Sequence, residues 1–238
     1  VQRHTTALLA AEDCALRVPG IVGRDDGLSY FAMQDLGSER LRFERLSPQW
    51  FERLGRALGG FQRLRPDIDL PRHDLEAELE VLDGARGNAL FLADLPEGWE
   101  DARQQLADLA GELVPRQLAL THRDLHDGQL LPAPAVLDFD LLCLADPAQD
   151  VANLSAHLEL RALQSVPGVD DRRAEAWTAA LIAGHGADAS DPHLHVLRAA
   201  TFLRLALVYR LRPRWAALSP ELVRRAERCL REVPRSVV

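Results

Sequence analysis

The chain has 238 residues, of which 47% are hydrophobic and 27% charged, a balance that excludes a disordered or collagen-like protein. Its net charge of −8 argues against a nucleic-acid partner, which would need a basic surface for the phosphates. All 28 residues in the Lys+Arg total are arginine. The chain therefore contains no Walker A loop, no Schiff-base lysine and no Ser–Lys dyad.

Membrane and secretory signals are also missing from the sequence. No apolar stretch reaches the roughly 18–20 residues that span a bilayer, and no apolar signal core follows the first residues. Cys14, Cys143 and Cys229 lie far apart and form no CxxC pair. We therefore expect no membrane partner, a reducing compartment and a cytoplasmic location.

The front of the chain mixes one helix with extended pieces. Residues 7–16 predict a helix. Two extended pieces follow over 20–23 and 28–33, and the turn-like residues 24–27 join them. Residues 34–37 are typical of a connector.

After about residue 46 the pattern becomes helical. Ser47 and Pro48 give an N-cap followed by proline at the first helical position. Apolar side chains then recur at spacings that place them on one helix face. They are Trp50, Leu54, Leu58 and Phe61. Further helices are predicted over 73–85 and 97–113.

The middle of the chain predicts three short strands, over 118–121, 129–131 and 135–139. The last two are joined by 132–134 and favour a hairpin. From Asp146 onward the pattern is helical throughout.

Start signals place the helices of this last part. Asp146 and Pro147 read as an N-cap and a first-turn proline, with Gln149 completing a capping-box pattern. A second helix begins at 191–192, is apolar on most faces and stops before Pro213, so we expect it at the centre of a helical bundle. A last helix covers about 220–233.

Polar residues concentrate between the predicted strands, over 121–131 and 136–140. Polar side chains flanked by apolar strands are typical of a cleft at the edge of a core. If Asp138 and Asp140 lie on a strand, they share one face, and two close carboxylates are unfavourable without a cation between them. Hard oxygen ligands of this kind suit Mg²⁺.

These residues resemble a known family. His122-Arg123-Asp124-Leu125 followed by Gln129 is similar to the catalytic loop of protein-kinase-like phosphotransferases, H-R-D-L-x-x-x-N, and Asp138 matches the metal-binding aspartate of D-F-G. The segments 122–126, 137–140 and 145–152 resemble, in order and spacing, three motifs of the aminoglycoside phosphotransferase and choline kinase branch.

The resemblance implies an α+β, protein-kinase-like fold. A partial small β lobe would cover residues 1–36, and a mostly helical large lobe over 37–238 would carry the catalytic loop and a metal-binding strand. The implied reaction moves the γ-phosphoryl group of ATP or GTP, with Mg²⁺, to a hydroxyl of a small molecule resembling an aminoglycoside, a sugar or choline.

The resemblance also implies a role for each site residue. Asp124 would orient or accept the proton of the attacking hydroxyl, and His122 would pack beneath the loop. Asp150 would brace the loop backbone from behind. The implied metal ligands are Gln129, Asp138 and Asp140. The adenine edge would meet the backbone of Gln34, Asp35 and Leu36.

Two departures from the family pattern leave alternatives open. Gln129 stands where the family usually has asparagine, and the phosphate-binding lysine and glycine-rich loop have no counterpart. We favour a missing front of the small lobe, while a reduced lobe that holds the phosphates in another way is the other reading. A catalytically impaired, kinase-like binding module is therefore the alternative function.

A metallohydrolase is a further alternative, because His122, Asp124, His126 and Asp127 resemble a permuted zinc cluster. That reading requires a strand-rich sandwich with further histidine ligands downstream. If the chain is a phosphotransferase, its acidic balance favours a cationic acceptor.

Overall fold

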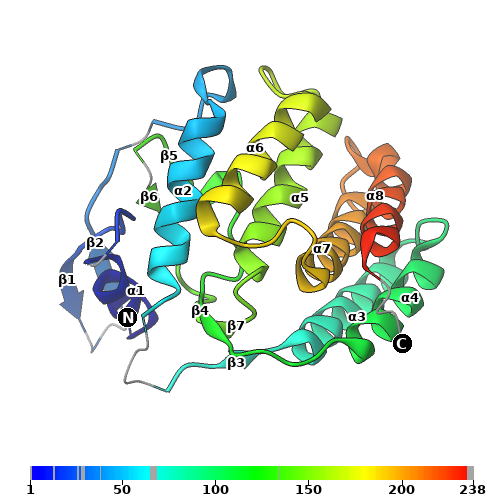
Figure 1. The fold of residues 1–238 in the computed structure, drawn as a ribbon, viewed down its shortest axis with the longest axis horizontal. Helices are drawn as coiled ribbons and strands as arrows, with labels where there is room; N and C mark the ends of the chain where they lie inside the picture. Colours follow the sequence, from blue (N-terminus) through cyan, green and yellow to red (C-terminus); the bar gives the residue numbers. More distant parts are fainter. Residues whose placement is uncertain are drawn as a thin grey trace.

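The computed structural model describes residues 2–12, 14–25, 27, 30–37, 39–64, 69–133 and 135–234. Its front segment holds helix α1 (Gln2–Glu12) and an antiparallel hairpin of β1 (Ile21–Asp25) and β2 (Tyr30–Met33) (Figure 1). The predicted helix over 7–16 is thus displaced, since α1 begins five residues earlier and Cys14 already lies in a bend. Leu28 and Ser29, predicted to start the second strand, lie outside the described residues.

Seven longer helices build the rest of the described chain. They are α2 (Pro48–Phe61), α3 (Leu75–Leu92), α4 (Trp99–Glu112), α5 (Gln149–Leu163), α6 (Asp171–His185), α7 (Pro192–Arg210) and α8 (Ser219–Glu232), with 3-10 turns at Phe43–Arg45, Asp127–Gln129 and Ala216–Leu218. The predicted stripe on α2 is confirmed, because all four of its apolar residues are buried.

Helix α7 lies at the centre of the far end of the molecule, as its apolar faces predict. It packs against α3, α4, α5 and α8 (Figure 1). The buried Trp99 of α4 donates its indole N–H to the Leu203 carbonyl of α7 at 3.0 Å. A second core, which contains Phe51, Phe139 and Trp177, lies among α2, α5, α6 and the middle loops.

Helices α2 and α6 lie side by side at unusually short range (Figure 1). A Cβ atom at Gly55 would lie 2.2 Å from the Leu181 carbonyl oxygen, and one at Gly184 would lie 2.0 Å from the Glu52 carbonyl oxygen. The two helices can therefore approach this closely only where both lack a side chain.

Short strands position the middle loops. One sheet has the order β3 (Arg72–His73), β7 (Cys143–Ala145), β4 (Ala119–Thr121), with β3 parallel and β4 antiparallel to β7. The predicted hairpin is confirmed as β5 (Leu130–Leu131) and β6 (Ala135–Val136). The strand expected over 135–139 ends at Val136. Strand β7 was not predicted from the sequence. No helix among the described residues is long and apolar enough to cross a membrane.

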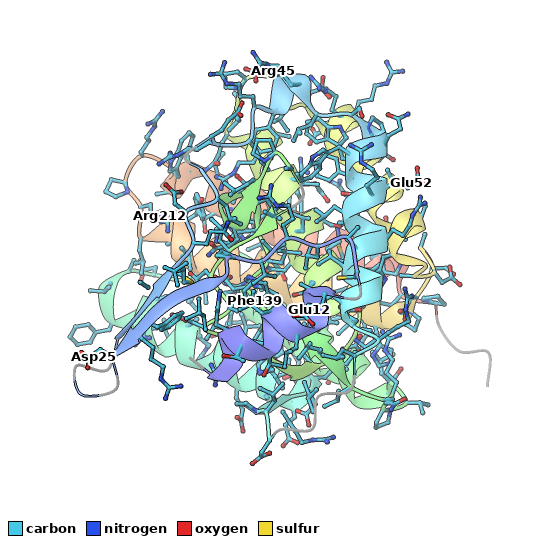
Figure 2. The ribbon with its side chains drawn as sticks, turned by 90° about the vertical axis from the view of Figure 1, so that its left-hand side faces the viewer. Glu12, Asp25, Arg45, Glu52, Phe139 and Arg212 are labelled. Carbon is cyan, nitrogen blue, oxygen red and sulfur yellow. The ribbon has the colours of Figure 1, made fainter. Side chains whose placement is uncertain are left out.

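The front segment packs over the end of the β5–β6 hairpin. Figure 2 shows α1 and the β1–β2 hairpin in front of the segment that carries Phe139. The Val136 N–H donates to the Arg17 carbonyl at 2.9 Å, and His4 of α1 lies 6.0 Å from the Phe139 ring. Phe139 is therefore buried between α1 and the helical part, while its neighbours Asp138 and Asp140 are exposed.

Candidate active site

The loop between β4 and β5 is held from behind by a buried carboxylate, as the sequence predicts. Asp150, in the first turn of α5, is fully buried and accepts the His122 N–H at 2.9 Å and the Arg123 N–H at 2.8 Å. Burial raises the pKa of the Asp150 carboxyl, while the neighbouring His122 and the backbone donors act against that shift. Arg123 occupies the left-handed region at φ 75°, a conformation that this bracing stabilises.

Helix α5 presents further polar side chains to the same loop. Asp150, Asn153, His157 and Arg161 recur at helical spacings of three, four and four, which places them on one face. Asn153 donates from Nδ2 to the Leu125 carbonyl at 2.9 Å, and Arg161 donates from Nε to both Asp127 oxygens at 2.9 and 3.0 Å. The helix therefore holds the loop at three points. Only the first of these three contacts, that of Asp150, was predicted from the sequence.

His122 joins this loop to the residues after β6. Its Nδ1 accepts the Asp124 N–H at 3.3 Å, so Nε2 carries the proton and donates to the Leu137 carbonyl at 2.8 Å. The ring lies 4.9 Å from that of Phe139 and is buried. Because both ring nitrogens bond to the chain, His122 cannot be the metal ligand that a metallohydrolase would need.

Asp124 and His126 lie at the open side of the loop. The Asp124 side chain is 37% exposed, and its Oδ2 lies 3.9 Å from His126 Nε2. His126 Nδ1 accepts the Gly128 N–H at 3.0 Å, which places the proton on Nε2. A partly exposed carboxylate on a fixed loop has the access that a proton acceptor needs.

The residues after β6 do not form the strand on which the metal-site argument relied. Asp138 has φ 62° and Asp140 lies in a turn, so alternation along a strand cannot place their carboxylates on one face, and that expectation is wrong. Instead, Gln129 donates from Nε2 to Asp138 Oδ2 at 3.1 Å, and Arg3 donates to the Asp140 carbonyl.

One cavity of about 520 Å³ brings most of the predicted site residues together. Its lining includes the expected adenine-contacting residues Gln34, Asp35 and Leu36 and the expected metal ligands Gln129, Asp138 and Asp140. An amide oxygen and two carboxylates on one wall are the hard donors that Mg²⁺ prefers, so this donor set fits the ion. His122 and Asp124 do not line the cavity; they lie on the loop that leads into it.

Two backbone N–H groups of the connector are already in use. The Gln34 N–H donates to the Gly20 carbonyl at 2.6 Å, and the Gly37 N–H donates to Asp35 Oδ1 at 2.8 Å. The Gln34 carbonyl, together with the backbone of Asp35 and Leu36, is left for a ligand edge. His4, which the sequence did not single out, also lines this cavity and lies 5.5 Å from the Phe31 ring.

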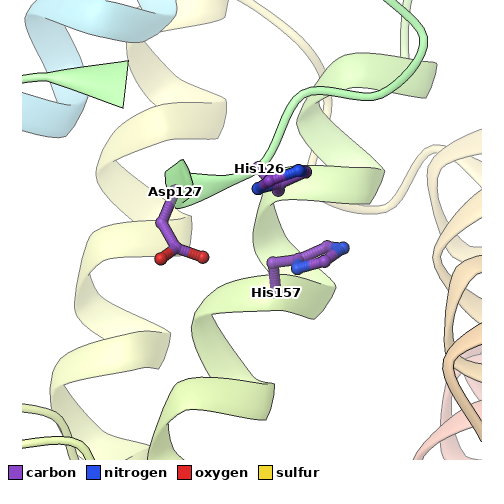
Figure 3. A group of neighbouring side chains, drawn as sticks. All are labelled: His126, Asp127 and His157. Atoms are coloured by element: carbon purple, nitrogen blue, oxygen red, sulfur yellow. The ribbon is translucent and has the colours of Figure 1, made fainter. Parts of the chain in front are cut away.

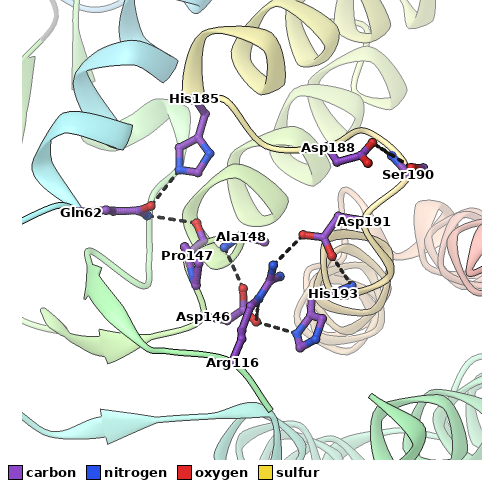
Figure 4. Close-up of polar contacts among 10 residues, drawn as sticks. All are labelled: Gln62, Arg116, Asp146, Pro147, Ala148, His185, Asp188, Ser190, Asp191 and His193. Carbon is purple, nitrogen blue, oxygen red and sulfur yellow. Dashed lines mark hydrogen bonds and ion pairs between the residues drawn. The ribbon is translucent and has the colours of Figure 1, made fainter. Parts of the chain in front are cut away.

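Asp146 accepts the Ala148 N–H at 2.8 Å, the contact expected of the predicted N-cap, although α5 itself begins at Gln149. Its carboxylate also pairs with Arg116 Nε and His193 Nδ1, both at 2.7 Å (Figure 4). Burial would raise the pKa of Asp146, but the bonds from His193 and Arg116 hold it below its ordinary value. Arg116 also bonds Asp191, so this group ties the segment before β4 to the start of α7.

Comparison with known proteins agrees with this geometry. Residues 2–186 match the model of the phosphotransferase enzyme family. No curated protein sequence matches the chain.

Solved structures share the fold at low sequence identity. A choline/ethanolamine kinase family protein from Mesorhizobium loti is 17% identical with a TM-score of 0.65, covering 98% of this chain and 82% of that one. An amicoumacin kinase is 12% identical with a TM-score of 0.63, covering 98% and 78%. A spectinomycin phosphotransferase in complex with ADP and spectinomycin is 13% identical with a TM-score of 0.60, covering 97% and 82%.

These structures share the kinase-like α+β architecture over nearly the whole chain, which excludes the strand-rich sandwich of the metallohydrolase reading. The family match covers the front segment, the catalytic loop, α5 and α6. The chain belongs to the phosphotransferase enzyme family.

Proposed function

We propose that the chain transfers the γ-phosphoryl group of ATP or GTP to a hydroxyl group of a small molecule. One observation carries the proposal. The Gln129–Asp138 bond lies on the wall of a cavity that reaches the connector at 34–36, and Asp124 lies on the same braced loop as Gln129. Phosphoryl transfer depends on positioning and charge neutralisation, and this arrangement offers both.

Each residue has a defined task in the proposed reaction. The hydroxyl oxygen of the acceptor forms a bond to the γ-phosphorus, the bond to the β–γ bridging oxygen breaks, and the nucleoside diphosphate leaves. Asp124 orients the hydroxyl and takes its proton. Gln129, Asp138 and Asp140 would hold Mg²⁺, which when bound neutralises phosphate charge. The Gln34 carbonyl and the backbone of 35–36 would meet the purine edge.

The ligands bound in the solved structures support a nucleotide co-substrate. The spectinomycin phosphotransferase structure holds ADP, and the amicoumacin kinase structure holds AMP-PNP and Ca²⁺. Their acceptors differ from each other, so they do not specify an acceptor for this chain.

Two isosteric substitutions test the proposal. We expect Asp124→Asn and Asp138→Asn each to reduce Mg²⁺-dependent nucleotide turnover, measured over a panel of hydroxylated compounds, by at least about 100-fold. Calorimetry should show that Asp124→Asn still binds Mg²⁺–ATP and that Asp138→Asn binds it more weakly. Asp108→Asn, on the exposed face of α4, is the matched control and should behave as the wild type. Turnover that survives both site substitutions contradicts the assignment.

A kinase-like binding module is the second candidate, favoured by the absence of lysine. It predicts that Mg²⁺–ATP or Mg²⁺–GTP raises the melting temperature while no compound in the panel is phosphorylated. Turnover of any acceptor excludes it.

A further inference from the structure

The side of Asp124 away from the nucleotide cavity carries an uncommon pair of histidines. The His126 and His157 rings stack with their centroids 5.0 Å apart and their planes 22° from parallel (Figure 3). His157 is buried, and among the described residues neither of its ring nitrogens has a hydrogen-bond partner. A buried imidazole left without partners is costly, which points to a ligand that completes it.

Arginines surround this pair. Burial lowers the pKa of His157 well below its ordinary value, and the positive charges of Arg204, Arg161 and Arg212 lower it further. Arg204 of α7 donates from Nη2 to Asn153 Oδ1 at 2.8 Å, and Asn153 in turn bonds the Leu125 carbonyl. Arg204 is therefore linked to the loop of Asp124 through one intervening side chain, that of Asn153.

The charges on this side do not cancel. Arg161 bonds both oxygens of Asp127 and offsets that carboxylate, while Asp124 Oδ2 lies 3.9 Å from His126 Nε2. No carboxylate within the described residues pairs with Arg204 or Arg212. Arg161 and Asp127 also line a cavity of about 620 Å³, to which Arg40 adds a further positive charge. This cavity shares Gly37, Leu131 and Leu137 with the nucleotide cavity.

A metal ion is a poor occupant for the same group, although ligand atoms of His126, Asp127 and His157 lie within 4.8 Å of one another. The Gly128 N–H occupies Nδ1 of His126 and leaves a proton on Nε2, so this ring has no free lone pair. The Asp127 oxygens belong to Arg161, and the arginines around the group would repel a cation.

We propose that the acceptor is an anion: a small hydroxylated acid whose carboxylate or phosphate lies against Arg204 and Arg161. The proposal rests on the proposed phosphotransferase function and names its acceptor class. It reverses the expectation drawn from the net charge of −8, because the local charge beside Asp124 has the opposite sign. The acceptor hydroxyl would lie between this arginine group and Asp124.

A series of acceptors that differ only in charge tests the proposal. D-gluconate, D-glucitol and 1-amino-1-deoxy-D-glucitol share one polyol chain that ends in a carboxylate, a hydroxyl or an ammonium group. D-glycerate, glycerol and 3-amino-1,2-propanediol form the same series on three carbons. We expect the acid of at least one series to bind and to be phosphorylated with the highest kcat/KM. If neither acid binds or reacts, or if an ammonium compound is preferred, the proposal is overturned.

Substitutions of Arg204 test whether this residue causes the preference for the acid. Arg204→Gln should raise KM for the acid by about tenfold or more, as expected for losing one charge-assisted contact, and should raise KM for the neutral polyol much less. Arg204→Lys should restore part of the preference. Arg228→Gln, on the exposed face of α8, is the matched control. Equal KM changes for charged and neutral compounds would overturn the role of Arg204.

Nucleotide binding separates the two proposals. Calorimetry with Mg²⁺–AMP-PNP reports the nucleotide site without any acceptor. If the analogue binds and the acids neither bind nor react, only the anionic acceptor fails. If the analogue does not bind while the acids bind in an Arg204-dependent way, the anion site stands and the phosphotransferase proposal fails.

Discussion

Replacing Asp150 with asparagine tests whether the buried carboxylate positions the catalytic loop. The side chain keeps its shape, but one of its two acceptor oxygens becomes an NH₂ group that faces a backbone N–H of His122 or Arg123. A hydrogen bond to a charged group contributes about 1.5–3 kcal/mol, and an unsatisfied buried N–H costs about 1–3 kcal/mol. Removing a buried charge offsets part of this loss, since burial raises the pKa of Asp150.

We expect a net loss of about 2 kcal/mol in the free energy of unfolding. For a protein of this size the loss corresponds to a melting temperature lower by roughly 4–8 °C. Urea denaturation gives the free energy, and kcat measured well below the new melting temperature reports the loop. We expect kcat to fall because Asp124 is displaced, with a smaller change in the dissociation constant of Mg²⁺–ATP. A free energy within about 0.5 kcal/mol of the wild type, together with unchanged kcat, would refute the reasoning.

Three other predictions follow from the described contacts. Gly55→Ala should destabilise the protein by about 1–3 kcal/mol, because its Cβ would meet a carbonyl oxygen of α6 at 2.2 Å, and urea denaturation measures this. Gly84→Ala, with nothing within 4 Å on α3, should instead stabilise it by about 0.5–1 kcal/mol, so a loss here would contradict the packing argument. The pKa of His157 is lowered in the folded state, so the free energy of unfolding should fall as the pH drops from 6.5 toward that pKa, by up to about 1.4 kcal/mol per pH unit. His157→Gln should flatten this pH dependence, measured by urea denaturation at several pH values. An unchanged slope in the variant would contradict the role of His157.

Periodic helices were predicted well from the sequence because one feature, the apolar stripe, decides both their formation and their packing. Helix α2 begins at Pro48 and buries the predicted face, and α7 occupies the central place that its apolar faces require. Helix α1 begins earlier than predicted, because its apolar residues follow only a weak helical period. Strand β7 carries three residues and no alternating pattern, so local sequence contains no signal for it.

The candidate site shows the same difference. Residues within local motifs were predicted from the sequence, whereas contacts between distant segments were not. The motif spacing identified Asp150 and His122, and it identified metal-ligand candidates that the structure brings to one cavity with the connector. It misplaced Asp138 on a strand, because the left-handed backbone there depends on the His122 bond to Leu137 rather than on local propensity. The arginine group was missed because Arg161 lies on α5 and Arg204 on α7, and only the packing of these two helices brings both near His157.

The attachment of the catalytic loop to α5 has a consequence for motion. Asp150 and Asn153 lie one helical turn apart and hold backbone groups at three positions of the loop, His122, Arg123 and Leu125. Loop and helix therefore move as one rigid body. Any movement of the front segment toward the helical part would be taken up by the connector after β2, so Asp124, on the loop that α5 holds, would stay in place.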